Sequence, residues 1–321
     1  MTIALRPAPS DDSSVDPQEG NERPPLLPVR HPNQDLFICD VLDAIPKDDM
    51  ASMEHPVFSL STKPDNRTRR YEHNDSVIEI IPSGKGLATI HDKDVLIYCI
   101  SQLIAKMNQG EEPNRTVRLQ AYDMLCATNR QTSGAGYRLL GDALTRLRGT
   151  TVRTNIKTGG IEETRIFGLI EEAKITRKTF DGRMLDLEIT LSEWVYRSVI
   201  SKNVLTLHRD YFRLRKPFER RLYELGRKHC GMQDEWRIGL ELLQKKCGSS
   251  SPLRVFRALV KKVCEHDADH GHIPDYAVSM KDDVVLFRKR SGLKALPNAE
   301  AIDDAPHIDP ETMHDAKTAA P

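Results

Sequence analysis

The sequence predicts an α+β fold, built from two successive units that lie between two tails. Three observations support this prediction. Helical and strand-like patterns alternate along the middle of the chain, one order of elements occurs twice, and prolines and acidic residues accumulate at both ends. The chain has 321 residues, of which 39% are hydrophobic and 29% charged, which suits about two domains.

Both ends of the chain have the composition of disordered tails. Residues 1–35 carry six acidic and three basic residues, and residues 291–321 carry six acidic and two basic residues. Eleven of the nineteen prolines lie in these two segments. Such segments bury too little apolar surface to fold. We therefore expect disordered tails at 1–35 and 291–321, and folded domains at 36–200 and 201–290.

The first unit contains helical and strand-like patterns in turn. Apolar residues between 92 and 108 recur at helical spacing, and Gly110 ends that pattern. The glycine pair at 159–160, between two alternating runs, predicts a β-hairpin. The expected elements, in order, are strand 77–81, helix 92–108, strand 116–119, helix 121–127, helix 135–148, strands 151–157 and 163–171, strand 185–191 and helix 192–200.

The second unit begins near residue 203 and repeats part of this order. Gly231 and Gly248 end two helical patterns, and Pro252 suits the first turn of a third helix. Alternating runs on either side of 281–283 predict another hairpin. The expected elements are helices 218–229, 240–246 and 252–265, and strands 276–280 and 284–289.

In both units a short helix, a turn, a longer helix and a hairpin follow one another. This order is typical of the winged-helix variant of the helix-turn-helix motif. The sequence therefore predicts tandem winged-helix domains. In such domains the longer helix enters the major groove of DNA, and the hairpin meets phosphate.

The charge distribution favours a polyanionic partner. The formal net charge is zero, which alone argues against a nucleic-acid binder. However, residues 115–157 carry eight basic and two acidic residues, and residues 201–265 carry sixteen basic and seven acidic residues. Two basic segments between acidic tails indicate a polyanion such as DNA. A solvated basic face is the alternative.

The longer helix of the second unit has an apolar and a basic face. Its apolar face is expected to contain Phe256, Leu259, Val260 and Val263. Arg254, Arg257 and Lys261 fall on the opposite side, and no acidic residue occurs between 248 and 264. Arginine can bind guanine O6 and N7, and lysine can bind phosphate. The expected DNA contacts are Ser250, Ser251, Arg254, Arg257, Lys261 and Lys262.

The longer helix of the first unit is less uniformly charged. Tyr137, Leu140, Leu144 and Leu147 form its expected buried face. On the other side, Asp142 either accepts a hydrogen bond from cytosine or pairs with Arg138 or Arg146. The expected DNA contacts are Arg130, Gln131 and Ser133 in the turn, Arg138, Thr145 and Arg146 on the helix, and Arg153 and Lys157 near the tip of the following hairpin.

Signals for catalysis, cofactors and membranes are weak. The six cysteines form no C-x-x-C pair, and no run of about 18 apolar residues occurs, so we expect a cytoplasmic protein without a membrane segment. His270-Gly271-His272 is similar to the paired histidines of metal-dependent nicking nucleases, but a glycine separates them and no partner tyrosine is evident. We therefore expect no catalytic residue, metal or cofactor, with a nicking enzyme as an alternative.

Several segments carry a family resemblance. They are residues 117–125, 136–140, 143–150 and 189–194 and, most specifically, Arg220-Arg221-Leu222-Tyr223-Glu224-Leu225-Gly226 continuing to Gly231. From about 70 to 290 the chain resembles the bacterial plasmid replication initiator protein A family, of RepA type. The resemblance implies an initiator that binds repeated sites in double-stranded plasmid origin DNA, promotes origin opening and recruits host replication proteins, an initiator and a helicase.

Two points stay open beside this resemblance. A homodimer is possible. A winged-helix transcriptional regulator would use the same fold, and a map of the bound sites would separate the two functions, because direct repeats in an origin indicate initiation and a promoter palindrome indicates regulation.

Overall fold

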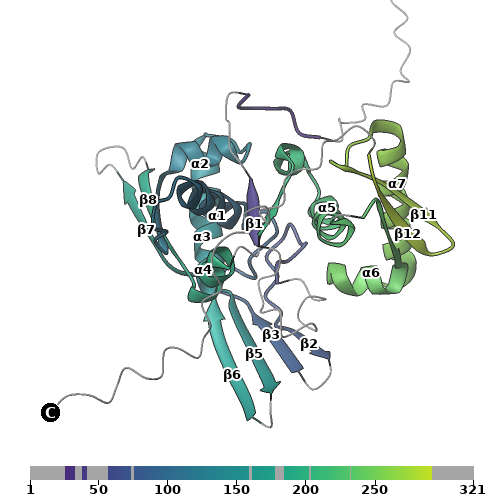
Figure 1. Ribbon diagram of the computed structural model, residues 1–321, viewed down its shortest axis with the longest axis horizontal. Coiled ribbons are helices and arrows are strands. Elements are labelled where there is room, and N and C mark those ends of the chain that lie inside the picture. Colours follow the sequence, from purple (N-terminus) through teal and green to yellow (C-terminus); the bar gives the residue numbers. More distant parts are fainter. Residues whose placement is uncertain are drawn as a thin grey trace, which may run out of the picture.

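The computed structural model describes residues 26–32, 38–41, 57–73, 76–158, 161–177, 184–201, 204–231 and 233–290. Of the expected tails, residues 1–25, 33–35 and 291–321 lie outside the described residues. Two hydrophobic cores are present. One is formed by residues between 57 and 204, and the other by residues between 207 and 287 together with Ile38 and Ile97. We call these parts the first and second unit; they lie side by side in Figure 1.

The first unit is built around a three-stranded antiparallel sheet covered by helices. Its elements, in order, are α1 (Lys93–Asn108), β4 (Thr116–Gln120), α2 (Ala121–Ala127), α3 (Gly134–Gly149), β7 (Ile170–Arg177), β8 (Met184–Leu191) and α4 (Glu193–Ile200). The strand order is β4-β8-β7. Strand β4 alternates as the sequence predicts, because Val117 and Leu119 are buried and the residues after them are exposed.

The second unit repeats this arrangement. Its elements, in order, are α5 (Pro217–Cys230), β10 (Glu235–Gly239), α6 (Leu240–Cys247), α7 (Leu253–His270), β11 (Tyr276–Lys281) and β12 (Val284–Lys289). The strand order is β10-β12-β11, so the last strand lies in the middle, as in the first unit. Asp282 and Asp283 both have positive φ, as a two-residue hairpin turn requires. The repeat therefore includes a helix and a strand before the short helix.

A second sheet is inserted into the first unit. It contains β2 (Arg69–His73), β3 (Ser76–Ile81), β5 (Thr151–Thr158) and β6 (Ile161–Gly168), in the order β2-β3-β5-β6, and it extends downward in Figure 1. The predicted hairpin at 151–171 is present as β5–β6. However, β5 pairs with β3, and the hairpin does not belong to the β4-β8-β7 sheet, against which α3 packs. Of the expected strand 163–171, residues 163–168 lie in β6, but the expected end is wrong, because residues 170 and 171 begin β7 in a different sheet.

The two units are joined by buried ion pairs between α1 and α5. Arg220 Nη1 lies 2.6 Å from Asp94 Oδ1, and both side chains are almost fully buried. Lys93 Nζ lies 3.1 Å from Glu224 Oε1. Two short strands, β1 (Cys39–Val41) and β9 (Val204–Thr206), pair antiparallel, and the 3₁₀ helix η2 (Arg209–Arg213) precedes α5.

Residues 26–32 pack against both units. The backbone N–H of Leu27 donates to the carbonyl of Arg213 at 2.9 Å. The backbone N–H of Arg30 donates to Asn129 Oδ1 at 2.8 Å, and His31 Nε2 lies 3.0 Å from the carbonyl oxygen of Arg130. The expectation of a disordered tail over 1–35 is therefore wrong for 26–32, where hydrogen bonds to residues far away in the sequence outweigh the proline-rich composition.

Candidate nucleic-acid interface

Four of the predicted contact residues lie on the solvent side of the α2–α3 turn and of α3. Gln131 and Ser133 are exposed in the turn, and Ser133 is the N-cap residue of α3. Arg138 is exposed and has no ion-pair partner in the described part of the chain. Thr145 is exposed as well, although its hydroxyl donates to the carbonyl of Gly141 at 3.0 Å. This surface can offer a guanidinium and several hydroxyl and amide groups.

Arg130 and Arg146 have a different role. Arg146 binds Asp92 through two hydrogen bonds of 2.7 Å, which raise the pKa of its guanidinium. Arg130 Nη2 lies 3.0 Å from Asp94 Oδ2. Both carboxylates are buried, so these two arginines anchor the turn and α3 to the start of α1. No local pattern in the sequence indicates this role, because the partners lie 36 and 54 residues away.

Asp142 also has a partner that the sequence did not indicate. Its carboxylate accepts a hydrogen bond from Lys85 Nζ, in the loop after β3. The expected pairing with Arg138 or Arg146 is therefore wrong. Arg138 remains available, and the negative charge of Asp142 is balanced from outside the helix.

Of the two predicted hairpin contacts, Lys157 is near the tip, opposite Glu162, whereas Arg153 is not. Arg153 lies within β5 opposite Ile166, well before the turn that joins Thr158 to Ile161. Its Nη1 lies 3.4 Å from Glu79 Oε2 on the neighbouring strand β3. The side chain of Lys157 lies outside the part of the chain whose side chains are described. The expectation that Arg153 is near the tip is wrong, because five further residue pairs follow it in the hairpin, the last of them Thr158 and Ile161.

The basic face of α7 is partly neutralised. Arg257 binds Asp283 in the β11–β12 turn through hydrogen bonds of 2.7 and 2.6 Å, and this pairing lowers the pKa of Asp283. Lys261 Nζ lies 3.8 Å from Glu265 Oε1. The expectation of a face without acidic neighbours is therefore wrong for these two residues. Arg254 and Lys262 are exposed and have no acidic partner among the residues that the structure describes.

The apolar face of α7 is narrower than predicted. Phe256, Val260 and Val263 are buried, but Leu259 is 38% exposed. Val255 is 49% exposed and lies one turn before Leu259, so apolar side chains stand on the solvent side beside Arg254 and Lys262. Exposed apolar groups of this kind can contact the methyl group of thymine in a major groove.

The turn before α7 is ordered by its own side chains. Gly248 ends α6 in the left-handed conformation that glycine favours. Ser249 Oγ and Ser251 Oγ lie 2.8 Å apart, and Ser250 is exposed.

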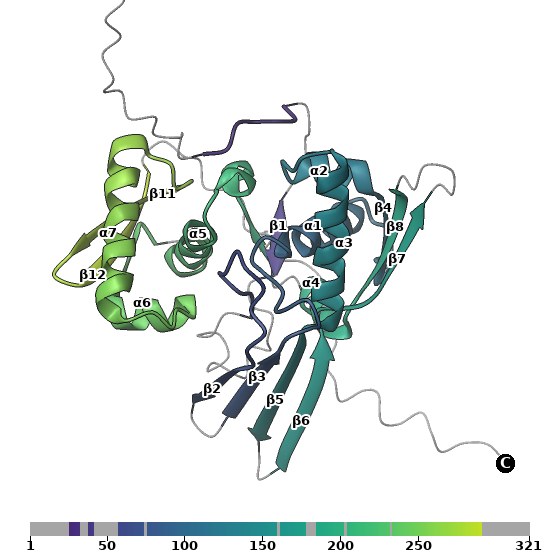
Figure 2. The same cartoon turned by 180° about the vertical axis from the view of Figure 1, so that it is seen from behind.

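Seen from behind in Figure 2, both α3 and α7 are visible along their length without another element in front of them.

The histidine group is divided between surface and core. His270 is exposed at the end of α7, whereas His272 is 2% exposed and faces Glu219 Oε1 at 3.5 Å and Asp267 Oδ1 at 3.9 Å. Within the described ranges, no three histidine, cysteine or acidic side chains come together as a set of metal ligands. In the same ranges, none of the helices has the length and apolar character needed to span a membrane.

Comparisons with known proteins identify the family. Residues 47–278 match the family described as Replication initiator protein A. The chain belongs to this family. A protein of Wigglesworthia glossinidia brevipalpis described as "Putative replication protein" is 36% identical over 263 residues, which cover 80% of this chain and 94% of that protein. The resemblance seen in the sequence is thereby confirmed, and the protein is a replication initiator of this family.

Two solved structures share the fold. A crystal structure of domains 2 and 3 of RctB superposes with a TM-score of 0.55 and 12% identity, covering 74% of this chain and 95% of that one. Another structure of RctB domains 2–3 has a TM-score of 0.50 and 13% identity, covering 73% and 95% of the two chains. At this identity the likeness concerns the fold, a mixed arrangement of helices and sheets.

Proposed function

We propose that this initiator binds repeated duplex sites in a plasmid origin with two winged-helix domains, at 36–200 and 201–290. Family membership supports the role in initiation. The DNA-binding part rests on one observation, the repeated topology. Both units have the order helix, strand, helix, helix, strand, strand, with the last strand in the middle of the sheet. Winged-helix domains have this arrangement, and their third helix enters the major groove.

The third helices are α3 and α7, and their exposed side chains suit a major groove about 12 Å wide. Arg138 on α3 and Arg254 on α7 are exposed guanidinium groups, which can read guanine or bind phosphate. Lys262 adds an exposed charge to α7. The ion pair between Arg257 and Asp283 connects α7 to the β11–β12 hairpin, which is the wing of this domain. Helix and wing would therefore contact DNA as one rigid surface. By the same topology, the wing of the first domain is β7–β8, and β5–β6 is an insertion.

The remaining parts of the proposal follow the family. We propose that the protein promotes origin opening and recruits a host initiator and helicase without cleaving DNA itself. The burial of His272, away from exposed His270, disfavours a nicking site at these histidines. Incubation of supercoiled origin DNA with the protein and Mg²⁺ or Mn²⁺ should leave it supercoiled, and a nicked product would contradict this part.

Binding measurements on single variants test the DNA-reading surfaces. Arg138→Ala should weaken binding to an origin duplex by about 1–3 kcal/mol and to a random duplex by less, since base contacts carry specificity. Lys262→Ala should weaken binding to both duplexes and lower the log–log salt slope by about 0.9, since each phosphate contact releases counterions. Arg254→Ala should show one or both effects.

The control is Arg118→Ala, on the outward face of the β4-β8-β7 sheet, where the Arg118 side chain is 80% exposed. It should bind both duplexes like the wild type. If the α3 and α7 variants were all indistinguishable from this control, the assignment of α3 and α7 as reading helices would be excluded.

A further inference from the structure

A basic groove lies between the two units, and Ser250 alone among its lining residues is an expected DNA contact from the sequence. Its volume is about 360 Å³. One wall is formed by residues 67–71, which lead into and include the edge strand β2. The other wall is formed by Lys245 and residues 248–250, which are the end of α6 and the α6–α7 turn. Every described side chain along it is basic or uncharged.

The cations of the groove exceed the acids that balance them. Arg67 and Arg69 share one carboxylate, that of Asp65, and this pairing holds the pKa of Asp65 well below its usual range. Arg70 pairs with Glu79, which Arg153 also contacts. None of these carboxylates lines the groove.

One donor in the groove is left over. Lys245 is exposed and forms no ion pair with any residue that the structure describes. Arg69 Nη1 also lacks a hydrogen-bond acceptor in the structure as described, but this atom is buried beneath the groove. The side chain of Arg67 is 76% exposed, so its charge can also reach a ligand. A groove with a spare donor and excess positive charge fits an anion.

The position of the groove indicates which anion. It adjoins the end of α6 and the α6–α7 turn, and in a helix-turn-helix unit the helix before the recognition helix crosses the DNA backbone. The backbone N–H groups at the start of a helix also favour negative charge. We propose that the groove binds the sugar-phosphate backbone of duplex DNA next to the segment that α7 reads, a proposal that rests on the proposed function.

The proposal has a consequence for how the two units act. Residues 67–71 belong to the first unit, whereas the turn belongs to the second, so one strand of DNA would be held by both. The contact carries no sequence information, because phosphates are the same at every base pair. It would fix the orientation of the second unit on DNA and add affinity equally for specific and random duplexes.

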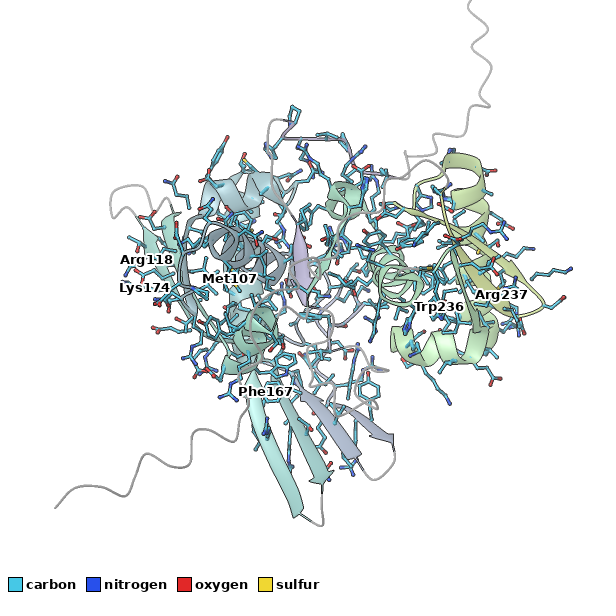
Figure 3. The ribbon with its side chains drawn as sticks, in the orientation of Figure 1. Met107, Arg118, Phe167, Lys174, Trp236 and Arg237 are labelled. Carbon is cyan, nitrogen blue, oxygen red and sulfur yellow. The ribbon has the colours of Figure 1, made fainter. Side chains whose placement is uncertain are left out.

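Charge-neutralising variants with matched controls test the groove. Lys245→Gln and Arg67→Gln remove one groove charge each. Their controls are Lys106→Gln in the last turn of α1 and Arg118→Gln on strand β4 (Figure 3), both with exposed side chains outside the proposed DNA-binding elements. All four are made in the full chain, and thermal unfolding checks that each variant folds like the wild type.

Each groove variant should bind an origin duplex and a random duplex roughly fivefold more weakly. The log–log salt slope should fall by about 0.9 for each variant, and both controls should match the wild type. Replacement of single phosphates by uncharged methylphosphonates locates the contact. At one phosphate beside the α7 segment, the replacement should weaken wild-type binding and have no further effect on Lys245→Gln.

The outcomes separate this inference from the proposed function. If the wild type binds no duplex at all, both fall. If Arg254→Ala weakens binding while Lys245→Gln and Arg67→Gln behave like their controls, DNA binding stands and the groove is excluded. If the effects of Lys245→Gln and of every methylphosphonate are additive, Lys245 does not contact a phosphate and the inference is overturned.

Discussion

Arg220 is the residue whose removal should most strongly loosen the junction between the two units. Its guanidinium lies 2.6 Å from Asp94 Oδ1 and donates to the carbonyl oxygens of Phe212 and Leu214 at 3.2 and 3.1 Å. The side chain is 3% exposed, and Asp94 is 1% exposed. Arg220 therefore joins α5 to α1 and fixes the end of η2 at the same time.

The magnitude follows from what Arg220→Met leaves behind. Removing one partner of a buried ion pair costs about 3–5 kcal/mol, because the other charge stays buried. In this variant Asp94 still has its ion pair with Arg130, whose Nη2 lies 3.0 Å from Asp94 Oδ2. We therefore expect a loss of unfolding free energy at the lower end of this range, about 3 kcal/mol. This loss is a large part of the ~5–15 kcal/mol that stabilises a typical folded protein.

The two tryptophans allow the loss to be assigned to each unit. Trp194 lies on α4 in the first unit, and Trp236 lies on β10 in the second. Urea unfolding of the Trp194→Phe and Trp236→Phe proteins therefore reports one unit at a time. Arg220→Met should lower the urea midpoints of both units and make the two midpoints differ, since the units lose the Arg220–Asp94 ion pair that joins them. Arg197→Met, at a surface pair whose side chains are 74% and 53% exposed, should cost less than about 1 kcal/mol.

A double variant gives the refuting result. Asp94→Asn should cost less in the Arg220→Met protein than in the wild type, because the two residues share one interaction. A loss below about 1 kcal/mol for Arg220→Met, or strict additivity with Asp94→Asn, would contradict the view that this pair holds the units together.

Two further predictions concern two glycines of α3 and the pH dependence of stability. Gly136→Ala should destabilise the protein by about 1–3 kcal/mol, because a Cβ there would lie 1.8 Å from the carbonyl oxygen of Gln131. Gly141→Ala should stabilise the protein by about 0.5–1 kcal/mol, because open space surrounds that position. Urea unfolding of both variants measures these changes. Burial, with the nearby charge of Arg220, lowers the pKa of His91 from 6.5 to about 4. The unfolded chain therefore takes up this proton first, so stability present at pH 7 should be lost as the pH falls from about 6.5 to about 4, and His91→Gln should flatten that part of the profile.

Local patterns were sufficient for much of the fold. Helix α2 has the predicted bounds, and β11–β12 and the helices ended by Gly231 and Gly248 lie where periodicity and glycine placed them. Helix α7 continues to His270, five residues beyond its predicted end, because its polar last turn carries no apolar periodicity. Strand β10 was missed, since a short edge strand such as Glu235–Gly239 has almost no local pattern.

The candidate site could be predicted only in part, because its charges are balanced over long distances. Helical spacing identified exposed Arg138 and Arg254. It could not reveal that Arg146 forms an ion pair with Asp92 or that Arg257 forms one with Asp283, since these carboxylates come from other elements. The basic groove was not predicted either, because its two walls are far apart in the sequence.

Footprinting on the parent replicon shows whether both units bind repeated duplex sites in an origin. The wild-type chain should protect direct repeats within the origin, each covering two neighbouring major-groove segments, one for α3 and one for α7. Arg254→Ala should reduce protection in one segment of every repeat, and Arg138→Ala should reduce it in the other. Protection confined to a promoter palindrome, or no protected repeats on replicon DNA that the protein binds, would contradict the account.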